Sequence, residues 1–310
     1  MRAAKQLLQL LEAHQPSVLV SGRYTDCQRG LSQAFKKDGW VDELYTPKAL
    51  VEHYRAWQEL LDAREVTQNL PVTQLFTGQL LTIKGEYGNC GARLEMFKQH
   101  SVISRLCHDC YKVQILPVDL IGLMQVYFVL RKLDLPNDNS RKCMIELREP
   151  VTYPYKGYIY CETEVEVVDS LARFRELLKE LGLSNIYSGI SHGCSEYGLE
   201  FPEFKYSADG AHQSFERPAD WDRQEAEFWA GRGEVSPLRA DNNHEGMSLN
   251  DVIGLRCWID YAQMIGDESW RMFRDRPRNI GPPQFAQRVG EQAARRHAEM
   301  QELRNKIAAS

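Results

Sequence analysis

The order of strand-like and helix-like segments between residues 111 and 192 restricts the fold more than any other feature of this 310-residue chain. Four segments have the alternation or the β-branched and aromatic content of strands: residues 112–116, 142–148, 156–161 and 185–190. Amphipathic helical segments follow the first and the third of them, at residues 118–133 and 163–181. The order β-α-β-β-α-β is that of the ferredoxin-like fold. The sequence therefore predicts an α+β protein with a ferredoxin-like core at about residues 111–192.

The sequences on both sides of this core predict mostly helices. Thr46 and Pro47 suit the N-cap and the first turn of a helix that runs to about residue 65. After the core, helical patterns cover residues 220–229, 248–265 and 284–308. We therefore expect a mostly helical N-terminal region at 1–100, the cysteine-bearing ferredoxin-like core at 101–200, and a mostly helical C-terminal region at 201–310.

The sequence shows neither an export signal nor a membrane span. In residues 1–15 the leucines are interrupted by Gln9 and Glu12, which is typical of an amphipathic helix and not of a signal peptide. The most apolar segment, residues 115–130, contains proline and aspartate and is too short to cross a bilayer. We therefore expect a cytoplasmic protein that does not interact with a membrane.

The chain has eight cysteines: Cys27, Cys90, Cys107, Cys110, Cys143, Cys161, Cys194 and Cys257. Because thiols stay reduced in the cytoplasm, metal or redox chemistry explains them better than disulfides do. Cys107 and Cys110 form a Cys-x-x-Cys pair directly before the first predicted strand. The pair alone fits a metal site, a redox pair or the protein core.

The predicted fold brings further cysteines to this pair. In a ferredoxin-like sheet, the first two strands begin at the end where the last two strands finish. Cys143 opens the second strand, Cys161 closes the third, and Cys194 follows the fourth. Since soft thiolates bind zinc and iron–sulfur clusters, the sequence predicts a metal centre at this end of the sheet. The expected ligands are Cys107, Cys110, Cys143 and Cys194.

Two other cysteines are alternative ligands. Cys90 lies in a glycine-rich segment, and Cys161 alternates with Ile159, which favours a place in the core. One close pair with two isolated cysteines favours an iron–sulfur cluster over zinc, but the spacing leaves both open. It also leaves open a thiol redox pair and cysteines without any metal.

Charged residues lie beside the expected ligands. Arg141 and Lys142 precede Cys143 and can either hold a phosphate or carboxylate or stay solvated. His192 lies two residues before Cys194 and is the candidate general acid or base. No nucleophile elbow, P-loop or His-Glu-x-x-His motif is present, so the sequence predicts no reaction. The predicted function is that of a cytosolic metalloprotein, expected to be an enzyme, that acts on an anionic small molecule.

An alternative function comes from residues 156–162, which partly resemble the RNP1 stretch of RNA-recognition domains. The resemblance implies that Tyr158 and Tyr160 stack on bases. With zinc bound by the cysteines, the alternative is a zinc-stabilised RNA-binding or protein-interaction module. The sequence departs from that motif at Ile159, where a small residue is expected, and a net charge of −5 argues against a general nucleic-acid coat. A third alternative is a protein-interaction module with structural cysteines only.

Overall fold

The computed structural model describes residues 44–63, 79–84, 90–204, 215–230, 232, 249–278 and 283–309. The predicted N-terminal amphipathic helix and Cys27 lie outside these residues. Among the helices that the structure describes, none combines the length and the apolar content that a bilayer crossing requires.

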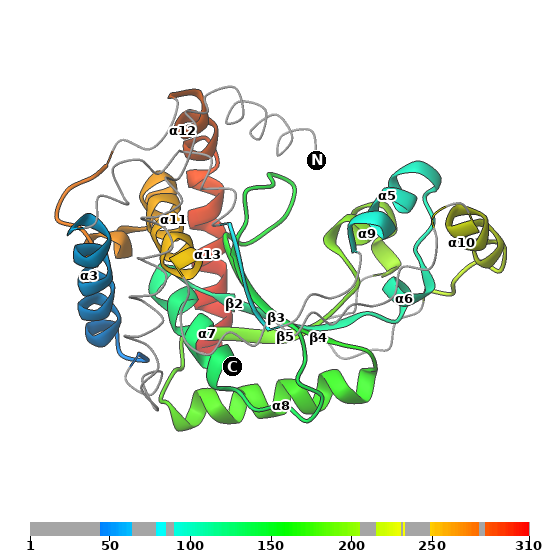
Figure 1. Ribbon diagram of the computed structural model, residues 1–310, viewed down its shortest axis with the longest axis horizontal. Coiled ribbons are helices and arrows are strands. Elements are labelled where there is room, and N and C mark those ends of the chain that lie inside the picture. Colours follow the sequence, from blue (N-terminus) through cyan, green and yellow to red (C-terminus); the bar gives the residue numbers. More distant parts are fainter. Residues whose placement is uncertain are drawn as a thin grey trace.

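A five-stranded antiparallel sheet with the strand order β1-β3-β4-β2-β5 forms the centre of the molecule (Figure 1). Its strands are β1 (Leu80–Lys84), β2 (Tyr111–Pro117), β3 (Arg141–Ile145), β4 (Tyr155–Cys161) and β5 (Ile186–His192). The prediction of an α+β protein is confirmed. Strands β2 to β5 correspond to the four predicted strands, and β1 adds a fifth strand at the edge, beside β3.

Two helices, α7 (Leu120–Lys132) and α8 (Glu164–Glu180), pack on one face of this sheet (Figure 1). Helix α7 begins after Asp119, whose carboxylate accepts a hydrogen bond from the Gly122 amide at 2.8 Å. Helix α8 begins after Thr163, whose hydroxyl accepts one from the Glu166 amide at 3.1 Å. Both N-caps satisfy amides that have no partner within the helix. The apolar residues of β2, β3 and β4 that face these helices form the main core: Val113, Ile115, Cys143, Ile145 and Ile159.

The remaining helices form two groups, one on each side of the sheet in Figure 1. We call the first group the helical body: α3 (Pro47–Ala63), α11 (Leu249–Ile265), η4 (Glu268–Met272), α12 (Pro283–Gly290) and α13 (Ala293–Ala309). We call the second group the small lobe: α5 (Cys90–His100), α6 (Arg105–His108), α9 (Ser195–Glu200), η3 (Pro202–Phe204) and α10 (Asp220–Ala230). The small lobe has a separate core, built from Met96, Phe97, Cys107, Tyr197, Phe204 and Trp221.

Helix α13 holds the connection between β3 and β4 in place. The guanidinium of Arg296 is wholly buried and donates hydrogen bonds to the backbone carbonyl oxygens of Val151 (2.8 Å), Glu146 (3.1 Å) and Arg148 (3.1 Å). Further along α13, Leu303 packs against Leu116 at the end of β2. The C-terminal helix therefore positions residues 146–151, which border the site described next.

Candidate ligand cleft on the open face of the sheet

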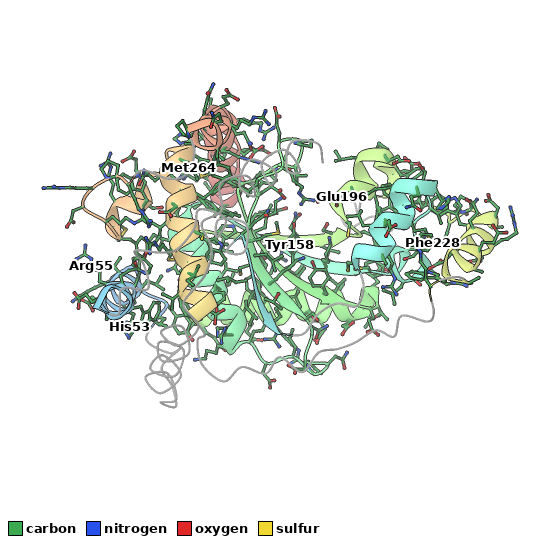
Figure 2. The ribbon with its side chains drawn as sticks, turned by 45° about the horizontal axis from the view of Figure 1, so that its top comes forward. His53, Arg55, Tyr158, Glu196, Phe228 and Met264 are labelled. Atoms are coloured by element: carbon green, nitrogen blue, oxygen red, sulfur yellow. The ribbon has the colours of Figure 1, made fainter. Side chains whose placement is uncertain are left out.

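The sheet face that α7 and α8 leave uncovered, here called the open face, carries charged and aromatic side chains. Lys112 on β2 pairs with Tyr160 on β4 and Ser191 on β5, and Gln114 pairs with Tyr158. Because residues directly opposite in an antiparallel sheet point to the same side, these side chains share the open face. Figure 2 shows Tyr158 between the helical body, which carries Met264, and the small lobe, which carries Glu196 and Phe228.

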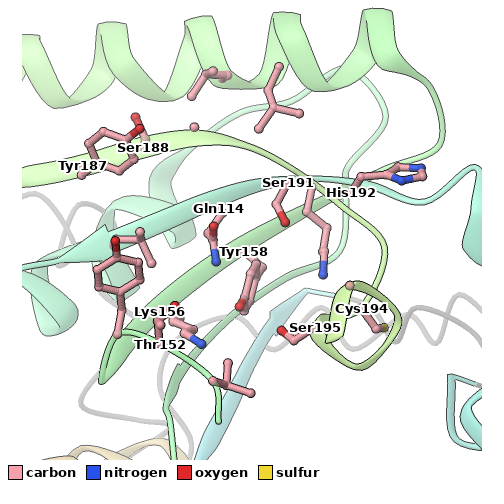
Figure 3. Close-up of a pocket in the computed structure, with 18 of the residues that line it drawn as sticks. Gln114, Thr152, Lys156, Tyr158, Tyr187, Ser188, Ser191, His192, Cys194 and Ser195 are labelled. Atoms are coloured by element: carbon pink, nitrogen blue, oxygen red, sulfur yellow. The ribbon is translucent and has the colours of Figure 1, made fainter. Parts of the chain in front are cut away.

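A cavity of about 620 Å³ lies on this face and extends around the edge strand β5. Figure 3 shows Gln114, Lys156 and Tyr158 on the strands, with Cys194 and Ser195 at the start of α9. Among the described lining residues no side chain is acidic, and four are cationic: Lys112, Lys156, Arg175 and Lys306. The volume is that of a small-molecule site.

Lys112 is a buried cation that has no carboxylate within ion-pair distance among the described residues, although Glu196 attracts it at longer range. Its side chain is only 5% exposed, and within the described part of the chain its ammonium forms neither an ion pair nor a hydrogen bond. The ammonium lies 5.1 Å from the ring centroid of Tyr158 and 5.9 Å from that of Tyr160. Such cation–π contacts offset only part of the cost of burying a charge. The other three lining cations have partners: Lys156 pairs with Glu146, Arg175 with Ser188, and Lys306 with Glu302.

Lys142 lies on β3, on the other side of β4 from Lys112, and increases the positive charge of this face. Its ammonium lies 5.0 Å from the ring centroid of Tyr160 and 5.8 Å from that of Tyr158. Burial lowers the pKa of Lys142, and the charge of Lys112 lowers it further. Two neighbouring ammonium groups that repel one another would be stabilised by a bound anion.

A buried ion-pair network closes one end of the open face. Glu146 is wholly buried, and its carboxylate accepts hydrogen bonds from Arg148 Nε (2.8 Å), Arg148 Nη2 (2.7 Å) and Lys156 Nζ (3.0 Å). Arg148 also pairs with Glu196 of α9, which links the network to the small lobe. Burial alone raises the pKa of Glu146, but the hydrogen bonds from Arg148 and the charge of Lys156 outweigh it, so the pKa lies below its ordinary value.

The charges on the open face do not balance. Its carboxylates are Glu146 and Glu196, and its cations are Lys112, Lys142, Arg148 and Lys156. Four cations and two carboxylates leave an excess of two positive charges among these described residues. The face therefore favours an anionic ligand.

The two predicted anion contacts lie on opposite faces of the sheet. Lys142 is on the open face, as described above. Arg141 is buried on the helix-covered face, where its guanidinium donates hydrogen bonds to the carbonyl oxygens of Leu130 (2.8 Å), Asn139 (3.1 Å) and Leu133. Burial lowers the pKa of Arg141 to about 10. These contacts cap the end of α7, so they give Arg141 a structural role.

The predicted general acid or base, His192, is 4% exposed. Its Nδ1 lies 3.0 Å from the carbonyl oxygen of Phe204, and its Nε2 contacts the carbonyl oxygen of His108. Burial lowers the pKa of His192. In Figure 3 its ring points away from Lys156 and Tyr158. The neutral ring donates through one nitrogen, so one of these two contacts is a hydrogen bond that links the small lobe to the sheet. The structure gives no support to a catalytic role.

The tyrosines of the alternative RNA-binding prediction share the open face but are not free for stacking. Tyr158 is 5% exposed, and the ammonium groups of Lys112 and Lys142 lie over the rings of Tyr158 and Tyr160. A base could stack on them only after these contacts had opened.

The structure separates the predicted metal ligands into two environments. Cys143 is fully buried in the main core, opposite Gly157 and on the helix-covered face. Cys107 and Cys194 instead contact the core of the small lobe, and the Cys110 carbonyl accepts a hydrogen bond from the Gly193 amide at 2.8 Å. In the described residues, no three histidine, cysteine, aspartate or glutamate side chains are already placed to hold a metal ion. The metal centre stays a prediction.

Gly193 shapes the turn that leads from β5 to Cys194. Its φ is +54°, and a Cβ at this position would overlap the ring of Phe204. We expect Gly193→Ala to lower the free energy of unfolding by about 2–4 kcal/mol, from left-handed backbone strain and overpacking together. The matched control is Gly182→Ala, with φ +67° but no atom within 4 Å of the new methyl group. Chemical denaturation of both variants compares them; equal losses would contradict the contact with Phe204.

No protein-family model, curated protein or solved structure matches the chain.

Proposed function

We propose that the protein binds an anionic small molecule, carrying a phosphate or carboxylate group, in the cleft on the open face of the sheet. One observation carries this proposal: Lys112 is a buried cation at the floor of a cavity whose described lining is cationic and contains no carboxylate. An anion at this position would neutralise the charge of Lys112 and relieve its repulsion with Lys142. Since His192 has both ring nitrogens in contact with backbone carbonyls, the proposal concerns binding and not catalysis.

We further propose that the core belongs to the ferredoxin-like type. Leaving β1 aside, the strand order is β5-β2-β4-β3, and α7 and α8 connect β2 to β3 and β4 to β5. This order and these connections support the assignment. Strand β1 would then be an addition at the edge beside β3.

A cytoplasmic location also stays part of the proposal. All seven cysteines of the described residues are free thiols, and this is in keeping with a reducing compartment.

The anion site predicts that Lys112→Met weakens binding of an anionic probe. Inorganic pyrophosphate, titrated calorimetrically into the full-length protein, is a suitable probe because it has no base or sugar. We expect the variant to bind pyrophosphate at least about tenfold more weakly, since methionine keeps the length of the side chain and removes its charge. The matched control is Lys98→Met on the exposed surface of α5, which should leave the affinity unchanged.

Two outcomes would overturn this proposal. One is that the wild-type protein binds neither pyrophosphate nor a carboxylate probe such as citrate. The other is that Lys112→Met and Lys98→Met bind the probe equally well. If the protein binds single-stranded RNA but not pyrophosphate, the RNA-binding alternative replaces the small-molecule site.

A further inference from the structure

Four cysteines gather where the small lobe joins the end of the sheet. Cys107 lies in α6 and Cys110 directly precedes β2; Cys194 is the N-cap residue of α9, and Cys90 is the first residue of α5. The hydrogen bond from the Gly193 amide to the Cys110 carbonyl fixes the start of α9 beside the Cys-x-x-Cys turn. Cys107 and Cys194 contact one hydrophobic core, to which α5 contributes Met96 and Phe97. Three segments that are distant in sequence therefore meet at these thiols.

Each of these four thiols lies within electrostatic range of the other three. Burial is the largest cause that raises the pKa values of Cys107, Cys110 and Cys194. The charges of the other three thiols raise the pKa of Cys110 further. Those of Cys107 and Cys90 raise the pKa of Cys194, and that of Cys90 raises the pKa of Cys107. For Cys143 burial is the one cause, so it does not belong to this group.

Cationic side chains surround the four thiols. Lys112 interacts electrostatically with Cys110 and Cys194, and Lys142 interacts with Cys90 and Cys194. Arg93 interacts electrostatically with Cys107. Four thiolates around a zinc ion or an iron–sulfur cluster carry a net negative charge. The neighbouring cations provide the compensation that such a centre needs when it is buried.

We propose that Cys90, Cys107, Cys110 and Cys194 bind a metal centre through four thiolates and thereby fasten the small lobe to the sheet. The centre is either a single zinc ion or an iron–sulfur cluster, since both take four cysteine ligands. Compared with the ligand set that the sequence predicts, Cys90 takes the place of Cys143. The four thiols are not bonded to one another, and metal binding draws their sulfur atoms inward. Cys90, the exposed member, has to move into the group.

Metal analysis of the full-length protein, purified without oxygen or chelators, tests this proposal. We expect about one zinc ion per chain in colourless protein, or iron and sulfide with broad absorption near ~400 nm. Cys90→Ser should lose at least about nine-tenths of the bound metal, because one of four ligands is missing. The matched control is Cys143→Ala, which should keep its metal. Since Cys90 is exposed, its replacement is the one least able to unfold the protein, and circular dichroism checks this.

The outcomes separate this proposal from its alternatives. Wild-type protein without metal, from cultures supplied with zinc and with iron, would overturn it. The proposal would also be overturned if Cys143→Ala lost its metal and Cys90→Ser kept it. That result would favour the ligand set that the sequence predicts, with Cys143 in place of Cys90. Lys112 and Lys142 lie near both the thiols and the cleft, but metal content and pyrophosphate binding are separate measurements, so this proposal and the anion site can fail separately.

Discussion

Glu146→Gln is expected to lower the free energy of unfolding by about 3–5 kcal/mol, because it breaks a buried ion-pair network by removing one partner. The amide keeps the shape of the side chain but loses its charge, and one of its two acceptor oxygens becomes a donor. Arg148 and Lys156, which now bond to both carboxylate oxygens, are then left partly unpaired inside the protein. Urea denaturation at pH 7 measures the loss.

The control for this variant is Glu180→Gln, at an exposed position at the end of α8, where a change within about 0.5 kcal/mol is expected. The effect of Glu146 should also depend on pH. Because the pKa of Glu146 is lowered in the folded protein, its contribution is present above the ordinary pKa of 4.5 and is lost as the pH falls through the lowered value. The difference between wild type and Glu146→Gln should therefore shrink in acid. An equal difference at pH 7 and pH 3 would contradict the ionised state of Glu146.

Arg296→Met is expected to lower the free energy of unfolding by a similar amount, about 3–5 kcal/mol. Methionine fills much of the space but cannot donate to the three carbonyl oxygens that Arg296 now satisfies between residues 146 and 151. It also removes the ion pair with Glu299 at 3.0 Å, which leaves this carboxylate, 7% exposed, with the Tyr153 amide at 2.8 Å and Arg295 at 3.5 Å. The matched control on the same helix is Arg304→Met, at an exposed position. A loss below about 1 kcal/mol in Arg296→Met would show that α13 does not hold the β3–β4 connection.

Local sequence patterns predicted most strands and helices between residues 111 and 192, because alternation and capping depend on residues only a few positions apart. The alternation at 142–148 predicted β3, and Thr163 predicted the start of α8. The same alternation also indicates where Cys143 lies. Cys143 shares its phase with Ile145 and not with Lys142 or Glu146, so its place in the core follows from the pattern that predicted the strand.

Contacts between distant segments could not be predicted in this way. The pairing of Arg148 with Glu196 joins residues 48 positions apart, and that of Arg296 with the Glu146 carbonyl joins residues 150 apart. The place of Cys90, the first residue of α5, depends on how α5 packs in the small lobe. In β2, the alternation of Lys112 and Gln114 with Val113 and Ile115 does indicate two different faces, but not that the charged face is buried.

Co-crystals of the full-length protein with inorganic pyrophosphate test the anion site most directly. We expect the anion in the cleft, with an oxygen within about 3 Å of Lys112 Nζ and the rings of Tyr158 and Tyr160 close by. An empty cleft at a pyrophosphate concentration that saturates the protein in solution would contradict the site. So would an anion bound only at the surface, away from Lys112.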